Sequence, residues 1–378
     1  MIGFNRPHIG GKEIEYIIEA VRREKISGNG YFTRRCQDFL EQRYGIRKVL
    51  LTTSCTDALE MAALLIRTEP GDEIIMPSYT FVSTANAFVL RGANIVFADS
   101  AVNSPNIDIE KLEVLITDRT IAIVVVHYAG FSCDMDHLMA MASQHNLYVI
   151  EDAAQAIEST YKGRPLGSIG HLGCFSFHET KNVISGEGGA LLINDSAFSD
   201  RAEIIWEKGT NRSAFARGEV AKYNWIDLGS SFLPSEIMAA FLFAQLEKIE
   251  EIQAKRHFIW DIYYKTLKDL ERNSLVSLPS TPSFTQHNAH LFYLVCRSEE
   301  ERNKLLDYLN SNGINAIFHY IALHRSPYFG AHYKGSELVE CDRYTSTLLR
   351  LPIYFELSSE EAHFVTQTIA NFYHEEIR

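Results

Sequence analysis

The sequence lacks the features that mark several common classes of protein. Its six cysteines, at positions 36, 55, 133, 174, 296 and 341, form no Cys-x-x-Cys pair and no other spacing typical of metal ligands. No metal site is therefore expected, and the thiols are expected to be reduced and mostly buried, as in a cytoplasmic protein. No apolar run approaches the roughly 20 residues of a membrane span, and the first six residues contain no signal-peptide core.

The net charge and the absence of two phosphate-binding motifs disfavour further classes of protein. The chain carries 36 Lys and Arg against 48 Asp and Glu, a net charge of -12 with no long run of one sign, so a basic face for nucleic acid is not expected. It has neither the Gly-x-x-x-x-Gly-Lys-Ser/Thr motif of nucleoside triphosphatases nor a Gly-x-Gly-x-x-Gly motif between a strand and a helix. Internal repeats and low-complexity segments are also missing. We expect no nucleic-acid partner and no membrane insertion.

What the sequence does contain is a regular alternation of apolar runs and helical stretches. Its 378 residues are 46% hydrophobic, enough for about two domains. The predicted strands are 48–52, 73–76, 94–98, 121–126, 147–150, 174–177 and 190–193, and the predicted helices are 57–67, 80–91, 109–116, 134–145 and 197–207. This alternation predicts an α/β fold with a mostly parallel, doubly wound sheet.

The second half of the chain predicts a smaller unit. Residues 210–233 look irregular, and one long helix is predicted over 235–270. Beyond Pro279 the pattern predicts strands at 289–296 and 315–318 and helices at 299–312, about 340–349 and from Ser358 onward. We therefore predict three parts, which are an N-terminal segment with a large domain (1–233), a connecting helix (234–270) and a small C-terminal α+β domain (271–378).

Polar and aromatic residues follow five of the predicted strands. In open parallel sheets, ligands bind beyond the carboxyl ends of the strands. The segments at this edge are Thr53–Leu59, Pro77–Phe81, His127–Tyr128, Glu151–Gln155 and the turn that contains Lys181. A lysine in such a turn suits covalent chemistry with a carbonyl, of which pyridoxal 5'-phosphate (PLP) is the recurring example.

Each of these residues also has a simpler structural interpretation. The turn Ser54–Thr56 suits a phosphate, but an ordinary helix cap would look the same. Asp152 could face a protonated pyridine nitrogen or cap the next helix, and Phe81 could stack on a planar ring or pack in the core. His127 and His178 could be acid–base groups or hydrogen-bonded structural residues.

Taken together, the motifs resemble the DegT/DnrJ/EryC1/StrS family of sugar aminotransferases, and the resemblance runs nearly end to end. It rests on Ile26–Gly30, Thr53–Glu60, Pro77–Ala87, Glu151–Gln155, Ser176–Asn182, Gly186–Ala190 and Leu351–Pro352. It implies a fold-type I, aspartate aminotransferase-like architecture with a mostly parallel seven-stranded sheet and a smaller C-terminal α+β domain. It also implies PLP as the cofactor.

The resemblance assigns roles to the cofactor-binding residues. Lys181 matches the lysine that forms a Schiff base with PLP, and Asp152 matches the partner of the pyridine nitrogen. Gln155 matches the group near the phenolic oxygen, and Phe81 matches the ring-stacking aromatic. The positions that match phosphate contacts are Cys55, Thr56 and Ser176.

Two positions depart from the family pattern. Cys55 stands where the family usually has Gly, although a backbone N–H can still serve there. Ser231 stands in place of an Asn that reaches the phosphate of the neighbouring subunit. Further candidates, chosen by their position in the pattern, are expected to contact the substrate: Phe32, Arg212, His319, Tyr320 and His324.

The segments Phe175–Asn182 and Glu207–Ser213 resemble family members that make dTDP-4-amino-4,6-dideoxygalactose for enterobacterial common antigen, O-antigen and lipopolysaccharide. This implies a homodimer with shared active sites that transfers the amino group of L-glutamate to C4 of dTDP-4-keto-6-deoxy-D-glucose. Amination at C3, a UDP-sugar substrate and a non-catalytic ligand-binding module on the same fold stay open. A dehydratase is disfavoured, because that branch carries His where this chain has Lys181.

Overall fold

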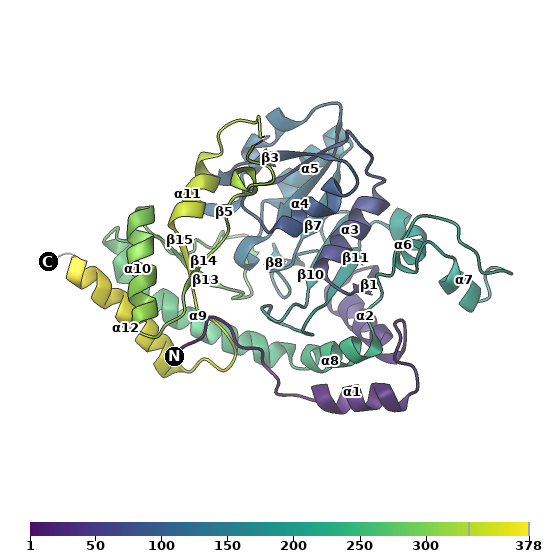
Figure 1. The fold of residues 1–378 in the computed structure, drawn as a ribbon, viewed down its shortest axis with the longest axis horizontal. Coiled ribbons are helices and arrows are strands. Elements are labelled where there is room, and N and C mark those ends of the chain that lie inside the picture. The colour runs from purple at the N-terminus through teal and green to yellow at the C-terminus, as the bar shows by residue number, and fades with distance from the viewer. Residues whose placement is uncertain (332, 377–378) are drawn as a thin grey trace.

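A seven-stranded sheet forms the centre of the molecule (Figure 1). The computed structural model describes residues 1–331 and 333–376. The strand order is β1-β11-β10-β7-β6-β2-β3, and only β11 runs antiparallel to its neighbours. The strands are β1 Lys48–Thr52, β2 Glu73–Pro77, β3 Asn94–Ala98, β6 Thr120–Val126, β7 Tyr148–Asp152, β10 Leu172–Ser176 and β11 Gly189–Ile193. The predicted mostly parallel, seven-stranded sheet is confirmed.

The sheet is buried on both faces, as its near-continuous Val and Ile runs predict. In β6, Ala122 and Val124 pack into one hydrophobic cluster, while Ile123 and Val125 pack into another on the opposite face. The first face is covered by α3 Cys55–Leu65, α4 Val82–Val89 and α6 Ser199–Trp206, and the second by α1 Glu13–Arg22, α2 Tyr31–Tyr44, α5 Met135–His145 and α8 Glu236–Leu246. All six cysteines are free, and all but Cys55 are buried.

The start of α2 is held by a carboxylate from a distant helix. Glu236, in the first turn of α8, accepts hydrogen bonds from the backbone N–H groups of Gly30, Phe32 and Thr33, and from the Thr33 hydroxyl. These N–H groups have no partner within their own helix, so the carboxylate satisfies them. Helices α1 and α2 were not predicted from the sequence. For α2 the capping partner is distant, since Glu236 lies 204 residues from Phe32.

Two other elements differ from the predictions. The predicted helix at 109–116 consists of two short 3-10 turns, η1 Ile109–Lys111 and η2 Glu113–Leu115. The single helix predicted over 235–270 is two helices, α8 and α9 Ile249–Arg272, because Lys248 leaves the helical conformation (φ -106°, ψ 7°). The two helices have different packing partners, since α8 contacts α1 and α2 whereas α9 contacts α12.

The C-terminal part of the chain contains a second, antiparallel sheet. Its order is β13-β15-β14, with β13 Phe292–Val295, β14 Ile317–Phe318 and β15 Leu348–Leu351, and it is accompanied by α10 Glu299–Ser311, α11 Val339–Thr347 and α12 Ser359–Glu376. The central strand β15 was not predicted. One core cluster contains both Ile74 of the large sheet and Leu294 of the small one. The division of the chain into three parts therefore stays a prediction.

Short elements complete the described chain. They are β4 Ser100–Ala101, β5 Ser104–Ile107, β8 Thr160–Tyr161, β9 Arg164–Pro165, β12 Thr285–Gln286, η3 Tyr128–Gly130, η4 Ser196–Phe198, α7 Arg212–Ala216 and η5 Leu323–Arg325. No helix within residues 1–331 and 333–376 is both long and apolar enough to cross a membrane.

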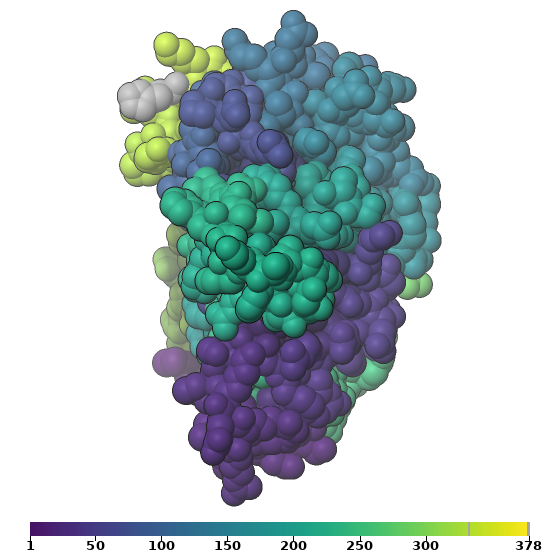
Figure 2. All heavy atoms as spheres, turned by 90° about the vertical axis from the view of Figure 1, so that its right-hand side faces the viewer, coloured from purple at the N-terminus to yellow at the C-terminus, as the bar shows by residue number. Residues whose placement is uncertain are grey.

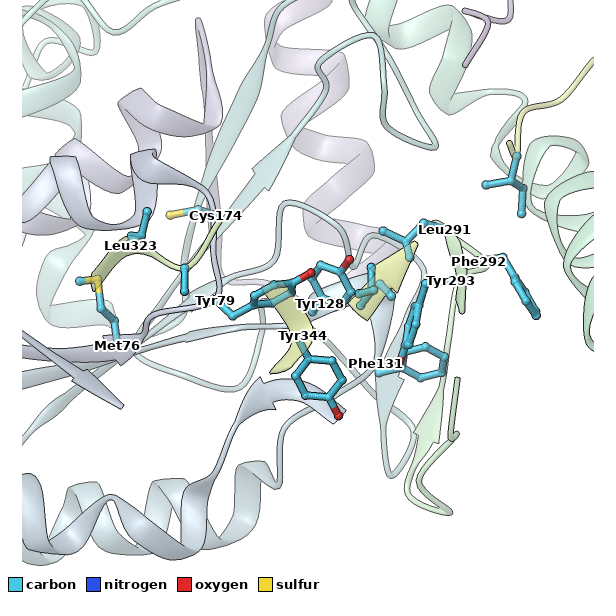
Figure 3. Close-up of a cluster of buried hydrophobic side chains, with 14 of the residues drawn as sticks. Met76, Tyr79, Tyr128, Phe131, Cys174, Leu291, Phe292, Tyr293, Leu323 and Tyr344 are labelled. Carbon is cyan, nitrogen blue, oxygen red and sulfur yellow. The ribbon is translucent and has the colours of Figure 1, made fainter. Parts of the chain in front are cut away.

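An aromatic cluster joins the two sheets (Figure 3). Tyr79, which follows β2, packs edge-on against Tyr128, which follows β6, with ring centroids 5.6 Å apart. Tyr128 contacts Tyr293 of β13 at 5.9 Å, and Tyr79 contacts Tyr344 of α11 at 5.9 Å. The strand ends of the large sheet are thereby fixed against the C-terminal part of the chain.

Candidate active site

One pocket collects most of the predicted site residues. It lies at the carboxyl edge of the large sheet, has a volume of about 620 Å³, and is also lined by residues of the small sheet. The predicted residues that line it are Cys55, Thr56, Phe81, Asp152, Gln155, Ser176, Lys181, His319 and Tyr320. They come from segments up to 265 residues apart, between Cys55 and Tyr320, so only the fold brings them together.

Lys181 lies in the connection between β10 and β11. Its backbone N–H donates to the His178 carbonyl at 2.9 Å, which closes a tight turn. Burial is the main reason that the pKa of the Lys181 amine falls from 10.5 to about 8, and the nearby positive charge of Arg350 lowers it further. Cys55 and Asp152 oppose this shift. An amine with such a pKa is partly unprotonated near neutral pH and can act as a nucleophile or a base.

Asp152 is a buried carboxylate at the end of β7. Its Oδ2 accepts a hydrogen bond from the Thr84 hydroxyl at 2.7 Å, and its Oδ1 accepts one from the Ala154 N–H at 3.2 Å. Burial raises the pKa of this carboxyl, while the two hydrogen bonds and the Lys181 charge act in the opposite direction. The carboxylate also lines the pocket, so a cationic ligand group would find an oriented partner there.

The turn between β1 and α3 forms a second polar wall. Ser54 caps α3, and its Oγ accepts a hydrogen bond from the Asp57 N–H at 3.1 Å. The first N–H groups of the helix, which include those of Cys55 and Thr56, have no partner within the helix, so this end suits an anion. Gly189 of β11 presses against the turn, since a Cβ at this position would lie 2.4 Å from the Cys55 nitrogen.

Phe81 and Gln155 also line the pocket. The Phe81 side chain is 54% exposed, and its ring centroid lies 6.2 Å from that of Tyr320. Gln155 is fixed at both ends, because its Oε1 accepts from the Ala129 N–H at 2.7 Å and its Nε2 donates to the Tyr320 hydroxyl at 3.1 Å. An exposed aromatic ring at this place is available for stacking on a planar ligand.

Arg350 is a pocket residue that was missed in the sequence. It lies on β15, is 8% exposed, and donates from Nη1 to His319 Nδ1 at 2.7 Å. Its guanidinium carbon lies 4.9 Å from the centroid of the Phe4 ring, and Phe4 also lines the pocket. A charged residue within the apolar run Leu348–Leu351 was the available signal, and it was not recognised because the strand itself was not predicted.

Phe32 and His324, two predicted substrate contacts, lie outside the pocket. Phe32 is 0% exposed and packs against Tyr16, so its side chain has no surface with which to contact a ligand. His324 is buried, and its Nδ1 lies 2.8 Å from the Ser78 hydroxyl while its Nε2 lies 3.2 Å from Asp342. His324 therefore ties the end of β2 to α11 rather than lining the pocket.

Arg212 and Ser231 lie in the segment 207–233, also outside this pocket. Arg212 is exposed, with its Nε 3.7 Å from the Glu207 carboxylate. Ser231 forms an isolated backbone bridge with Glu207. Within a single chain neither residue reaches the pocket, so a role in ligand binding would require a second subunit.

The two histidines considered as acid–base groups differ in position. His127 is fully buried, with its Nε2 2.9 Å from Glu151, whose carboxylate also accepts N–H bonds from Gly167, Ile169 and Gly170. This favours the structural interpretation of His127. His178 lines the pocket, with its Nδ1 2.9 Å from the Thr180 hydroxyl. No group of three or more His, Cys, Asp or Glu residues in the described part of the chain is arranged to hold a metal ion.

Comparison with known proteins agrees with this geometry. The model of the DegT/DnrJ/EryC1/StrS aminotransferase family matches residues 7–370. The spore coat polysaccharide biosynthesis protein SpsC of Bacillus subtilis strain 168 is 32% identical over 376 residues, covering 97% of this chain and 95% of that protein. GDP-perosamine synthase of Escherichia coli O157:H7 is 30% identical over 369 residues, covering 97% of both chains.

A solved structure leads to the same family. The putative sugar aminotransferase Spr1654 from Streptococcus pneumoniae, in its PMP form, superposes with a TM-score of 0.91 at 25% identity, covering 97% of this chain and 98% of that one. The PLP form of that protein superposes with a TM-score of 0.89. Members of the family bind PLP. The chain therefore belongs to the DegT/DnrJ/EryC1/StrS family and is a PLP-dependent sugar aminotransferase.

Proposed function

We propose that this enzyme transfers the amino group of L-glutamate to C4 of dTDP-4-keto-6-deoxy-D-glucose, giving dTDP-4-amino-4,6-dideoxy-D-galactose and 2-oxoglutarate. The observation that carries the proposal is the buried Lys181 amine, with a pKa of about 8, in the same pocket as the Asp152 carboxylate. The choice of sugar is supported by the likeness of Phe175–Asn182 and Glu207–Ser213 to enzymes that make this product.

The residues of the pocket fit PLP. When bound, PLP supplies a carbonyl that takes up amino groups and a ring that stabilises negative charge on the adjacent carbon. Asp152 would hold the protonated ring nitrogen, and Phe81 would stack on the ring. The free N–H groups at the start of α3 and the Ser176 hydroxyl would hold the phosphate. Gly189 packs so closely against this turn that a Cβ at position 189 would clash with the Cys55 nitrogen.

Lys181 would serve both as the point of attachment and as the proton carrier. Its pKa of about 8 is close to neutral pH, and a general base works best when its pKa lies near the operating pH. Tyr320 and His319, at the side of the small sheet, would contact the substrate. Gln155, held by Ala129 and Tyr320, would fix the orientation of the cofactor.

A homodimer is part of the proposal. The segment 207–233 and the N-terminal helices share one face of the molecule (Figure 2). Exposed apolar side chains occur in both parts, on α1 at Ile14, Ile18 and Val21 and in the segment at Phe215, Tyr223, Trp225, Ile226 and Leu228. A second copy would cover them, and Ser231 and Arg212 would then be available to the partner's site.

The oligomeric state is tested by light scattering after size exclusion. We expect a dimer for the wild type. Trp225→Glu, which places a charge at an 80% exposed ring, should shift the equilibrium toward monomer and lower activity in parallel. A monomeric wild type with full activity at high dilution would refute the shared site.

The activity is tested with purified protein, L-glutamate and a panel of dTDP- and UDP-ketosugars, with the products identified by mass spectrometry. The wild type should be yellow and should bleach with glutamate. Lys181→Ala should lose turnover, whereas Lys265→Ala, at a 75% exposed side chain on α9, should keep it. Near-normal activity of Lys181→Ala would refute the proposed role of Lys181 in the transamination. A C3-aminated or UDP-linked product would correct the substrate, and a colourless protein that binds no PLP would favour a binding module.

A further inference from the structure

His290 lines the pocket from a segment that a buried hydrogen-bond network holds in place. The residue is 4% exposed, and its ring Nδ1 lies 2.8 Å from Oδ1 of Asn182, which directly follows Lys181 in the chain. Its backbone N–H donates to the Asn288 side chain at 3.0 Å, and its carbonyl accepts from Arg256. Both the ring and the backbone of His290 are therefore fixed.

The Asn182 carboxamide can be oriented in only one way. Its Nδ2 donates to the backbone carbonyl of Asn288 at 2.8 Å, and a carbonyl oxygen can only accept. The same Nδ2 donates to Oε1 of Gln253 on α9, also at 2.8 Å. The atom that faces His290 is therefore Oδ1, and since this oxygen has no proton, the hydrogen bond must be donated by Nδ1 of His290.

This tautomer makes the other ring nitrogen of His290 an acceptor. Burial lowers the pKa of His290 well below its usual 6.5, and the charge of Lys181 lowers it further, so the ring is neutral near pH 7. A neutral imidazole has one proton, so Nε2 offers a lone pair. Among the residues that the structure describes, none bonds to Nε2, and this atom is reachable from the pocket.

Other polar groups that line the pocket on the side of the small sheet offer donors instead. Arg350 has only N–H groups, and its Nη1 donates to Nδ1 of His319 at 2.7 Å. A neutral His319 therefore carries its proton on Nε2 and is a donor there. The Tyr320 hydroxyl accepts from Gln155 and has a proton to donate. The acceptor of His290 thus suits a ligand that carries a hydroxyl group.

Of the two proposed substrates, only the ketosugar has hydroxyl groups, since L-glutamate has none. Consecutive Cα atoms are about 3.8 Å apart, so a ring that bonds to the Asn182 side chain lies beside the turn that carries Lys181. In a 4-ketosugar, the hydroxyl at C3 is attached next to the carbon that receives the amino group. Among the sugar hydroxyls, the one at C3 therefore fits this position best.

We propose that Nε2 of His290 accepts a hydrogen bond from the C3 hydroxyl of the ketosugar and so selects sugars with a hydroxyl beside the keto carbon. Asn182 is the positioning residue that fixes the tautomer. A sugar without this hydroxyl would leave a buried acceptor unpaired, which is unfavourable. The proposal rests on the proposed aminotransferase function and specifies how its pocket recognises the sugar.

The test compares His290→Asn and His290→Gln with the wild-type holoenzyme. Asparagine places a nitrogen where Nδ1 lies and can keep the bond to Asn182, whereas glutamine reaches the position of Nε2. The amine form should require roughly 3- to 10-fold more ketosugar in His290→Asn, with His290→Gln in between. Bleaching by L-glutamate should stay within about twofold, because that step leaves the contact unused. His137→Asn, at a 40% exposed side chain on α5, is the matched control.

Deoxygenated substrates identify the hydroxyl group. The wild type should discriminate against the 3-deoxy form of the ketosugar roughly 3- to 10-fold more strongly than against the 2-deoxy form. His290→Asn should lose most of this difference, because the variant no longer offers the acceptor.

Nitrogen NMR of the holoenzyme with isotope-labelled histidine tests the tautomer without any sugar. The signals of His290, identified by their absence in His290→Asn, should show a proton on Nδ1 and a bare Nε2. Asn182→Leu removes the oxygen that accepts from Nδ1, so this variant should also populate the tautomer with the proton on Nε2.

Several results would overturn the proposal. A proton on Nε2 in the wild type would remove the acceptor. Equal losses with glutamate and with the ketosugar in His290→Asn would indicate a structural role, and unchanged discrimination against the 3-deoxy form would assign the hydroxyl to another residue. If the wild type aminated a different ketosugar, the proposed function would be wrong, and the hydroxyl and deoxy forms of that sugar would still test His290.

Discussion

Replacing Lys181 by Met should stabilise the cofactor-free protein, even though it removes the central residue of the site. Burial lowers the pKa of the lysine amine from 10.5 to about 8. Each pKa unit corresponds to about 1.4 kcal/mol, so the charged amine destabilises the folded state by roughly 3 kcal/mol below pH 8. Methionine has a similar length and no charge, so the variant should gain about this free energy of unfolding at pH 7.

The pH dependence of this gain is the sharper test. Between pH 8 and 10.5 the folded wild type binds fewer protons at this site than the unfolded chain, so its stability rises with pH relative to the variant. The gain should shrink by about 1.4 kcal/mol per pH unit in this range and vanish near pH 10.5. Urea unfolding at pH 7, 8, 9 and 10, with Lys265→Met as the control, measures it. A difference that is independent of pH would refute the reasoning.

Three other changes test the architecture and the site. Glu236→Ala leaves three buried N–H groups of α2 without an acceptor and should lower the free energy of unfolding in urea by about 3–5 kcal/mol, with Glu236→Gln less affected. Gly189→Ala places a Cβ 2.4 Å from the Cys55 nitrogen and should weaken PLP binding at least about tenfold in a spectrophotometric titration, with unchanged affinity counting against the phosphate site. Asp152→Asn should slow bleaching by glutamate at least about 100-fold while the protein still binds PLP, and a wild-type rate would remove Asp152 from the mechanism.

The large sheet could be predicted from the sequence because its strands are continuous apolar runs with polar residues directly after them. This local signal correctly predicts that Asp152 and Lys181 lie at one edge of the sheet, and both line the pocket. The helix break at Lys248 gave no such signal, since neither proline nor glycine is involved. The break instead separates two helices that pack on different partners, α8 on α1 and α2, and α9 on α12.

Phe32 and Arg350 show why the rest could not be predicted. Phe32 was chosen by its position just after Ile26–Gly30, one of the segments that resemble the family, but Glu236 caps the helix there and the ring is buried in the core. The importance of Arg350 depends on His319 and Phe4, one 31 and the other 346 residues away. Both cases depend on partners that are distant in sequence, which no local pattern contains.

The reversed direction of β11 has a consequence for how this enzyme tolerates change. Because β11 returns along β10, its first residue, Gly189, pairs with both Thr52 and Ser176 at the edge where the pocket lies. One hairpin thus carries Lys181 in its connection, and Gly189 at its end packs closely against the turn between β1 and α3. Any shift of this hairpin would therefore displace the Lys181 amine and the turn between β1 and α3 together. We therefore expect insertions between 177 and 188 to lower activity far more than insertions of equal length in the loops at the opposite edge of the sheet.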